Sequence, residues 1–328
     1  MSQVKEIFTL FLGLVFTSLP FLLLGIVISS LLLVFVDEHG LAAKFPRNRF
    51  LGAIMGSSLG LILPVGQYGN IPVARRLLLQ GVSPVAVFSF LVAAPTLNIF
   101  TLNLTWQFFR SSSGFIFYRF FSGWLMALVI GILFSFYQEK PPSADKENIS
   151  PRTPSRLVRC GTFLAHKLDG DPLHRLGSLV YEYKNLNNVP KSPLKALQLL
   201  LTNIIAESLD LGWWLVFGCA IASLCQYFAP QSLLLSFSHN ALTQILGMML
   251  LGFFLSLGSV FNAFLPTTFM SFALPGSILS FLLFGSVFDL KSLPLFLVTF
   301  PLKIVFYLFT LSSLFTILVS LIVTYYIN

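Results

Sequence analysis

Long apolar runs, separated by short polar or Gly- and Pro-containing segments, dominate the chain. Eight of them are candidates for membrane-spanning helices, because about 20 apolar residues cross roughly 30 Å of hydrocarbon. They cover 7–36, 50–64, 84–109, 114–137, 197–227, 241–258, 276–290 and 294–325. The pattern predicts an all-α polytopic membrane protein with about eight transmembrane segments.

Two of these runs, 50–64 and 276–290, are too short to span a bilayer alone at a rise of 1.5 Å per residue. Both adjoin segments with Gly and Pro, so we expect broken or re-entrant helices there. The first run, 7–36, is about twice the length of a signal-peptide core and lacks an A-x-A-like cleavage site. We interpret it as a retained transmembrane helix.

A polar stretch at 138–195 divides the apolar runs into four and four. It carries ten Lys or Arg and six Asp or Glu residues, half of all 32 charged residues. Such a composition buries too little apolar area for a core, so we expect an extramembrane linker between membrane repeats at 1–137 and 196–328. Its basic residues place it in the cytoplasm, and four spans on either side then put both termini there. We therefore expect a multi-pass protein of the plasma membrane.

Composition narrows the classes of function. Charged residues make up 10% of the chain, against roughly 25% in an average soluble domain, and apolar residues make up 56%. The formal charge of +8 is scattered around the apolar runs and forms no continuous basic stripe. We expect the lipid bilayer as the surroundings and no nucleic-acid partner.

Motifs for catalysis and metal binding are missing. The chain has no H-E-x-x-H, no P-loop spacing and no G-x-S-x-G, and its four histidines do not cluster in the sequence. The three cysteines, Cys160, Cys219 and Cys225, give neither a disulfide framework nor a zinc spacing. We expect no enzyme activity, no metal and no cofactor.

An internal repeat is the most informative feature of the apolar sequence. Residues 89–98 align without a gap with 280–289, so that Asn98 faces Asp289. Leu51-Gly52 faces Leu246-Gly247 and Gly25 faces Gly218, in the same order. These matches predict two homologous four-helix halves, parallel or inverted, with a transport site at the interface between them.

Two Gly- and Pro-containing breaks lie at corresponding places, 64–72 and 258–266. We expect that no helix runs through the first break, because its prolines remove backbone donors and its glycines permit unusual dihedral angles. The freed backbone groups then need partners inside the protein or in a wet cavity, although an ordinary interfacial loop is an alternative. The pathway residues expected from the breaks are Pro64, Gly66, Gln67, Tyr68, Gly69, Asn70, Pro72, Asn262 and Pro266.

A second pair of breaks adds Pro95, Asn98 and Asp289 to the expected solute pathway. An acidic side chain at the end of an apolar run is costly unless it faces water, a partner or the interface. Asp289 is therefore either a group that couples transport to protons or cations, or the end of a helix beside Lys291. Lys303, in the last apolar run, could snorkel or pair with a carboxylate such as Asp289.

Glu207 and Asp210 are three residues apart and share one helical face. They could relay protons, or they could belong to an amphipathic helix on the cytoplasmic surface. Arg75 and Arg76 similarly mark either the positive cytoplasmic boundary, which we favour, or a site for an anionic solute.

The chain resembles the predicted permeases related to the ArsP organoarsenical efflux proteins, also described as UPF0718 or DUF318. Many of them carry P-x-C-x-C-G-x-x-P-V-A, and the matching residues here are Pro64, Gly69, Pro72, Val73 and Ala74. Phe90-Leu91, Ala94-Pro95 and Asn98 resemble the following F-L-x-x-x-P-x-x-N. Gly66 and Tyr68 replace the two cysteines, so thiol capture of an arsenical at this segment is excluded.

The sequence thus predicts a secondary transporter for a small solute. The substrate is unassigned, and efflux of a small solute or of a metalloid compound is one possible activity. A proton or sodium gradient would drive it, because no nucleotide-binding motif is present. The alternative is a non-transporting scaffold or assembly factor that acts through the 138–195 loop. A channel would differ from both by conducting without gradient coupling.

Overall fold

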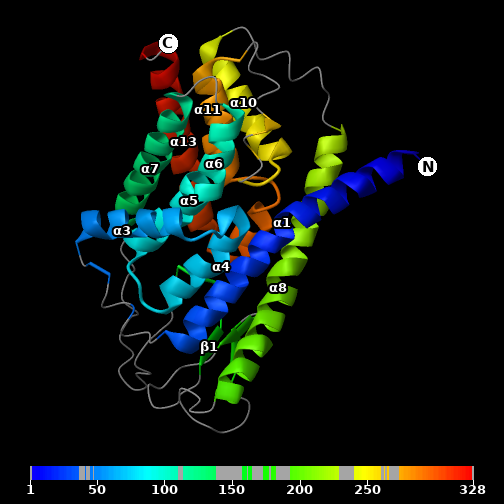
Figure 1. The fold of residues 1–328 in the computed structure, drawn as a ribbon, viewed down its shortest axis with the longest axis vertical. Helices are drawn as coiled ribbons and strands as arrows, with labels where there is room; N and C mark the ends of the chain where they lie inside the picture. Colours follow the sequence, from blue (N-terminus) through cyan, green and yellow to red (C-terminus); the bar gives the residue numbers. More distant parts are fainter. Residues whose placement is uncertain are drawn as a thin grey trace.

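Helices make up nearly all of the secondary structure in the described part of the computed structural model (Figure 1). The structure describes residues 2–36, 41, 45–46, 48–109, 114–137, 157–160, 162–164, 173–176, 179–181, 193–228, 240–259, 262, 264–265 and 273–326. The helices are α1 (Ser2–Phe35), α3 (Arg49–Ile62), α4 (Gly66–Leu79), α5 (Pro84–Leu97), α6 (Ile99–Phe108), α7 (Gly114–Phe134), α8 (Pro193–Phe228), α10 (Ala241–Leu255), α11 (Pro275–Val287), α12 (Leu293–Thr299) and α13 (Leu302–Tyr326).

Five segments of the described chain are long and apolar enough to cross a membrane. They are Gln3–Phe35, Pro84–Phe108, Gly114–Phe134, Pro193–Phe228 and Leu302–Tyr326. The apolar helices α3, α10 and α11 have 14, 15 and 13 residues, about 20 Å at 1.5 Å per residue. The prediction of a helical multi-pass membrane protein is confirmed at this level, whereas eight full spans stay a prediction.

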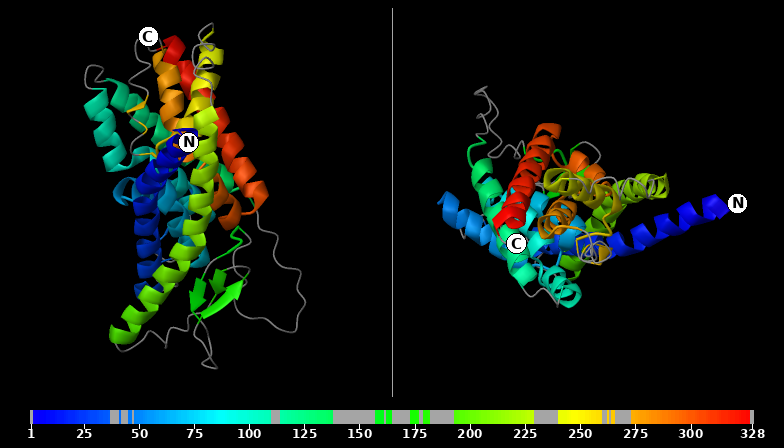
Figure 2. Two further views of the ribbon diagram at one scale, coloured as in Figure 1. Left: turned by 90° about the vertical axis from the view of Figure 1, so that its right-hand side faces the viewer. Right: turned by 90° about the horizontal axis from the view of Figure 1, so that it is seen from above.

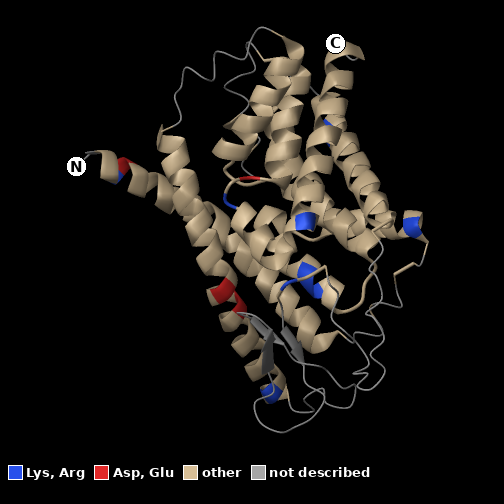
Figure 3. Ribbon diagram, turned by 180° about the vertical axis from the view of Figure 1, so that it is seen from behind, with Lys and Arg blue, Asp and Glu red and all other residues tan. Residues whose placement is uncertain are grey.

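The outer surface of these helices suits a lipid environment. Large apolar side chains are exposed along α1, α8 and α13, among them Phe16 (73%), Trp213 (70%) and Phe306 (65%). Charged residues are few on the ribbon, as Figure 3 shows. An apolar exterior of this extent is unfavourable in water and favourable in hydrocarbon.

Small residues set the packing of the central helices. A Cβ on Gly56 of α3 would lie 2.1 Å from the Ala86 carbonyl oxygen of α5, so only glycine permits this approach. In the second half, a Cβ on Gly285 of α11 would lie 2.9 Å from the backbone of Gly252 in α10. Such contacts are typical of membrane helix pairs, which gain from close backbone approach.

The two halves have a similar order of elements. α3, α5 and α7 pack in sequence in the first half, as α10, α11 and α13 do in the second. Proline stands at the start of both α5 and α11, which carry the matched segments 89–98 and 280–289. Common origin of the halves stays a prediction that this order favours.

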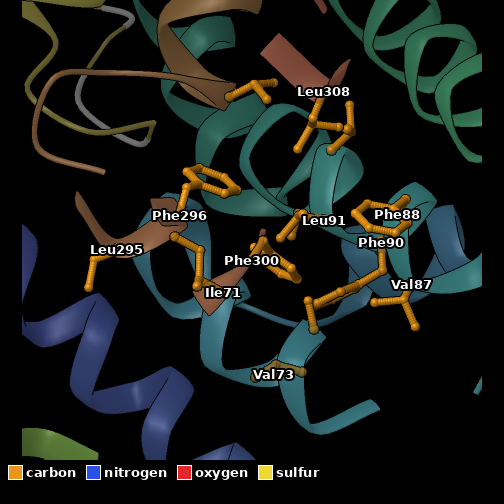
Figure 4. Packing of buried hydrophobic residues seen from close by; sticks show 14 of the residues in the cluster. Ile71, Val73, Val87, Phe88, Phe90, Leu91, Leu295, Phe296, Phe300 and Leu308 are labelled. Atoms are coloured by element: carbon orange, nitrogen blue, oxygen red, sulfur yellow. The ribbon is translucent and has the colours of Figure 1, made fainter. Parts of the chain in front are cut away.

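The halves share one apolar core. Figure 4 shows buried side chains from α4 and α5 of the first half packed with others from α12 and α13 of the second. The labelled members include Ile71, Val73, Phe88, Phe90, Leu91, Phe296, Phe300 and Leu308. The linker at 138–195 therefore divides the sequence but not the apolar core, because each half buries apolar side chains against the other.

Three helix ends differ from the predicted ones. The helix is interrupted at 63–65, within the predicted break, but α4 begins at Gly66 and runs through Pro72 to Leu79, so the expectation of a break extending to Pro72 is wrong. Membrane helices tolerate an internal proline when neighbouring protein satisfies the freed carbonyl group. Similarly, Pro95 lies in the last turn of α5. The predicted run 294–325 is divided between α12 and α13.

The described part of the 138–195 linker contacts the helices at Leu157–Cys160. Arg159 N donates to the Thr299 carbonyl at 2.9 Å, and the buried Cys160 thiol donates to Val298 O at 3.3 Å. Burial raises the pKa of the Cys160 thiol, while the nearby Arg75 guanidinium acts in the opposite direction. Three short antiparallel strands follow, β1 (Thr162–Leu164), β2 (Leu173–Leu176) and β3 (Leu179–Tyr181), in the order β1-β2-β3.

The linker and the C-terminus lie at opposite ends of the long axis of the molecule. In Figure 1 the strands lie at the lower end of the molecule beside the first turns of α8, and the C-terminus lies at the top; the left view of Figure 2 agrees. α8 runs upward from this lower end, while α7 and α13 lie in the upper part of the molecule. α1 packs along α8, and its first turns extend outward from the other helices, as the right view of Figure 2 shows.

Candidate functional site

Asp289 lies between the end of α11 and the start of α12 and is fully buried. Its Oδ2 accepts a 2.6 Å hydrogen bond from the Tyr68 hydroxyl of α4. Its Oδ1 accepts a 2.7 Å bond from Ser292 N, while Ser292 Oγ accepts from Asp289 N at 3.2 Å. The carboxylate is thus held by one bond within its own loop and one bond to the other half of the chain.

Lys291 supplies the charge that balances Asp289. Its buried Nζ lies 3.6 Å from Asp289 Oδ2 and donates a hydrogen bond to Ser256 O, just beyond α10. It also lies 5.6 Å from the centre of the Tyr68 ring, within cation–π range. Two charges in hydrocarbon are tolerated only when paired and hydrogen-bonded, as these are. Asp289 thus follows the end of α11 beside Lys291, as the second interpretation has it, but it is buried; a role in coupling stays a prediction.

Of the two alternatives for Lys303, pairing with Asp289 is wrong, because Lys291 takes that place. Lys303 is exposed at the start of α13 and forms no ion pair with a described carboxylate, which leaves the snorkelling alternative. The sequence shows Lys291 two residues after Asp289, but only the fold shows that both side chains are buried.

The two predicted helix breaks contact one another beside this pair. Gly66 has φ +63° and Gly258 has φ +97°, backbone angles that residues with a side chain rarely adopt. A Cβ on Gly66 would lie 3.6 Å from Ser259 Oγ, and one on Gly258 would lie 3.3 Å from the Tyr68 ring. The backbone therefore reverses at both breaks where they meet. Pro266, which belongs to the second break, lies outside the described residues.

Asn262 is engaged in holding the second break together. Its Oδ1 accepts bonds from Leu257 N at 2.9 Å and Ser256 Oγ at 3.0 Å, and its Nδ2 donates to Gly285 O at 3.0 Å. These bonds tie the break to α11. Asn262 therefore positions backbone in this structure, and a solute would have to displace one of its bonds.

Gln67 and Asn70 have buried polar atoms without a hydrogen-bond partner among the described residues. Both are buried in the first turns of α4, and neither Oε1 nor Nε2 of Gln67 has a hydrogen-bond partner among the residues that the structure describes. Asn70 Nδ2 donates to Leu91 O at 2.7 Å, while its Oδ1 has no partner among the described residues. Buried polar groups without partners are rare and costly, so they mark places where a ligand or water completes the bonding. Gly69 between them packs on α1, where its Cβ would meet Phe21 O at 2.3 Å.

The first half carries Asn98 where the second carries Asp289. Asn98 is buried between α5 and α6, and its Oδ1 accepts from Phe100 N at 2.9 Å as the cap of α6. Its Nδ2 has no hydrogen-bond partner in the described structure. Thus both matched segments end in a buried polar side chain, one neutral and one acidic.

A second charged cluster joins α4 to α8. Glu207 is fully buried, and its carboxylate lies 2.8 Å from Arg75 Nη2 and 3.0 Å from Arg76 Nη2. Ser29 of α1 adds a bond of 3.4 Å. The interpretation of 207–210 as a surface helix is wrong for Glu207, because α8 is one continuous helix of 36 residues packed along α1. Likewise, Arg75 and Arg76 are buried partners of Glu207, which the prediction of a cytoplasmic boundary position did not include.

Sequence reasoning missed Arg119. It lies in an apolar run and is fully buried in α7, where its guanidinium contacts Thr105 of α6 and Ser286 of α11. A single Arg six residues into an apolar helix is typical of a snorkelling residue, so position alone gave no signal.

A cavity and the clustering of metal-ligating side chains complete the description of possible ligand sites. No group of three His, Cys, Asp or Glu side chains within the described ranges could hold a metal ion. A cavity of about 600 Å³ lies between α8, α12 and the linker, lined by Trp214, Phe217, Leu293 and Cys160 among others. It is apolar and does not include Asp289 or Gln67.

Comparison with known proteins agrees with this picture. A family model described as a predicted permease, ArsP_1, matches residues 3–325. The chain is 31% identical over 309 residues to the "UPF0718 protein YcgR" of Bacillus subtilis, covering 94% of each chain. It is 29% identical over 322 residues to a "Putative two-component membrane permease complex subunit" of Streptococcus mutans, covering 98% of this chain and 96% of the relative. No solved structure matches the chain.

Proposed function

The chain belongs to the ArsP-related family of predicted permeases, and from this membership we propose a secondary transporter whose solute passes between the two helix breaks. The observation that carries the proposal is the buried network of Tyr68, Asp289 and Lys291. It joins the first break to the end of α11, at the contact between the halves. Transporters of several folds bind solutes where broken helices of two repeats meet.

Asp289 is the proposed coupling group. As a carboxylate it holds the Tyr68 hydroxyl and the Lys291 ammonium group together. Proton binding would neutralise it and weaken the hydrogen bond that it accepts from Tyr68 of the first half, so the two halves could separate at this point. A sodium ion could act in the same way, by competing with Lys291 for the carboxylate oxygens. Movement of the ion and movement of the breaks are thereby linked.

Gln67 and Asn70 are the proposed solute contacts. Their spare amide oxygen and nitrogen atoms lie in the first turns of α4, directly after the Gly66 reversal. Pro64, Gly69 and Pro72 shape this segment. Asn98 and Pro95 extend the pathway in the first half, as Asn262 and Pro266 do in the second. The solute itself stays unassigned, because Gly66 and Tyr68 offer no thiol for a metalloid, and efflux is one of two directions.

We place the linker on the cytoplasmic side of the plasma membrane, because ten of its residues are Lys or Arg. The sequence prediction put both termini on the same side. We infer a different side for the C-terminus, because the linker strands and the C-terminus lie at opposite ends of the long axis in Figure 1. The proposal is therefore a cytoplasmic linker with the C-terminus outside.

The scaffold alternative makes a separate prediction for the linker. Deletion of residues 141–155 leaves the Leu157–Cys160 contact in place while removing much of the polar stretch. A scaffold that acts through this loop should lose its function, whereas a permease should retain solute flux. The permease relatives favour the second outcome.

The test is transport in proteoliposomes with an imposed pH gradient and pyranine inside as the proton indicator. Methylarsenite, zinc and a panel of small organic solutes are added in turn to the wild type, to Asp289→Asn and to the exposed Glu6→Gln control. A solute that elicits proton flux in the wild type and control but not in Asp289→Asn supports the proposal. Unchanged coupled flux in Asp289→Asn contradicts it, and solute flux that ignores the gradient indicates a channel.

A further inference from the structure

Arg119 differs from every other buried cation in the described structure. Arg75 and Arg76 lie within 3.0 Å of Glu207, and Lys291 lies 3.6 Å from Asp289. Arg119 is equally buried, but no described carboxylate lies within 4.0 Å of it. A full positive charge inside a membrane protein is costly unless an anion or a strong dipole compensates it.

The two described partners of Arg119 are neutral hydroxyl groups. Nη1 donates to Thr105 Oγ1, and Nη2 lies 3.4 Å from Ser286 Oγ. Each hydroxyl hydrogen is already used on its own helix, by Thr101 O at 2.7 Å and by Leu282 O at 2.6 Å. The hydroxyl groups therefore orient the guanidinium as acceptors, but they do not neutralise it.

One edge of the guanidinium is left for a ligand. Nε has no hydrogen-bond partner in the described structure, and the Nη2 contact at 3.4 Å is long. Nε and Nη2 form the side-on edge of arginine, which presents two parallel N–H groups to a carboxylate or phosphoryl group. Free donors on this edge are what a bidentate oxyanion needs.

Further unpartnered polar atoms line the adjacent face of α6. Thr101 Oγ1 and Asn98 Nδ2 are buried without partners in the described structure. Asn98, Thr101 and Thr105 are spaced three and four residues apart and so share one helical face. Gly123, one turn after Arg119, packs against Thr96 at the end of α5, so α7 presents this face to the α5–α6 junction.

From these contacts we infer that Arg119 binds an oxyanion, a carboxylate or phosphoryl group, between α6, α7 and α11, with Asn98 and Thr101 as additional donors. The inference rests on the proposed transport function and assigns the solute an acidic group. Ser286 is three residues before Asp289, so an anion at Arg119 and an ion at Asp289 would act on the two ends of one short segment. An acidic solute taken up with a proton is the simplest chemistry for such a pair.

Equilibrium binding tests the inference without any gradient, so its failure is distinct from a failure of transport. Detergent-purified protein is titrated with ¹⁴C-acetate and ³²P-orthophosphate by scintillation proximity. Native mass spectrometry from phosphatidylglycerol nanodiscs reports whether a lipid headgroup takes the site instead. The variants are Arg119→Gln, Arg119→Lys and the exposed Arg49→Gln as a matched control.

We expect saturable binding of a free anion that is unchanged in Arg49→Gln and about tenfold or more weaker in both Arg119 variants, since lysine keeps the charge but loses the bidentate edge. Retained phosphatidylglycerol that is lost with Arg119 would support the oxyanion site but assign it to lipid. If the variants do not fold, the wild type alone decides: acetate or phosphate must raise its melting temperature above that in chloride of equal ionic strength. Absence of binding by every probe, or binding that Arg119 substitutions leave unchanged, overturns the inference.

Discussion

The Tyr68 hydroxyl donates a 2.6 Å hydrogen bond to Asp289, a residue 221 positions further along the chain. Tyr68 stands at the start of α4, directly after the first helix break, and Asp289 follows the last residues of α11. The bond therefore connects the broken segment of one half to the end of a short helix in the other. In the ArsP-like pattern this position is a cysteine, so the phenol takes its place in the site and binds a carboxylate.

Tyr68→Phe should keep the ring beside Lys291 and remove only this bond. We expect a loss of roughly 1–3 kcal/mol in stability, because the buried Asp289 oxygen loses a strong donor. Gradient-driven transport should fall with it. The apparent melting temperature in detergent and proton-coupled flux measure the two effects. Tyr307→Phe, at a half-exposed site on α13, is the control and should change neither.

Glu207→Gln should be the most destabilising single change of charge in the protein. It removes the negative charge that faces both Arg75 and Arg76 at 2.8–3.0 Å inside the helix bundle. Breaking a buried pair in this way typically costs about 3–5 kcal/mol. The measurement is the melting temperature, with Glu6→Gln on the exposed start of α1 as control. Equal melting temperatures for the two variants would contradict the buried ion pairs and indicate a surface position for Glu207.

The apolar periodicity was sufficient to predict the class of fold. All eight predicted runs contain described helices, because a run of apolar residues in a bilayer has few alternatives to helix. The breaks were found through Gly66 and Gly258, whose positive φ angles need glycine. The helix through Pro72 was not foreseen, since whether a neighbour satisfies a freed carbonyl depends on packing.

The charged residues were harder to interpret than the breaks. Asp289, Glu207 and Arg119 each look like the end or edge of an apolar run in sequence, and each is fully buried in the structure. Their partners lie more than 130 positions away for Glu207 and Asp289, so no local pattern announces them. A sequence gives the cost of burying a charge, but only the fold supplies the partner that offsets it.

The C-terminus should lie on the opposite side of the membrane from the linker. Alkaline phosphatase fused after Asn328 should be active, and green fluorescent protein inserted at position 145 should be fluorescent. The basis is the position of the two ends on the long axis in Figure 1, together with the ten basic residues of the linker. The opposite result would be an inactive phosphatase together with fluorescence of the green fluorescent protein both at position 145 and after Asn328. It would support the arrangement expected from the sequence, with four spans on either side of the linker and the C-terminus in the cytoplasm.

Two glycines on the same helix should respond to alanine with opposite signs. Gly218 of α8 lies against the loop that carries Asp289, and an added Cβ would meet Lys291 O at 2.5 Å. A Cβ added to Gly212, six residues earlier, would meet no atom within 4 Å. Gly218→Ala must displace the Lys291 backbone, which should cost roughly 1–3 kcal/mol and disturb the Asp289–Lys291 pair.

Gly212→Ala should instead stabilise α8 by about 0.5–1 kcal/mol, since alanine restricts the unfolded chain without a clash. Both substitutions add one methyl group to the same helix, so each variant is a control for the effect of the other on expression and on behaviour in detergent. Melting temperatures should therefore move in opposite directions, and coupled flux should fall only in Gly218→Ala. If both variants behave alike, α8 does not press on the Lys291 loop, and the position of the ion pair does not depend on this contact.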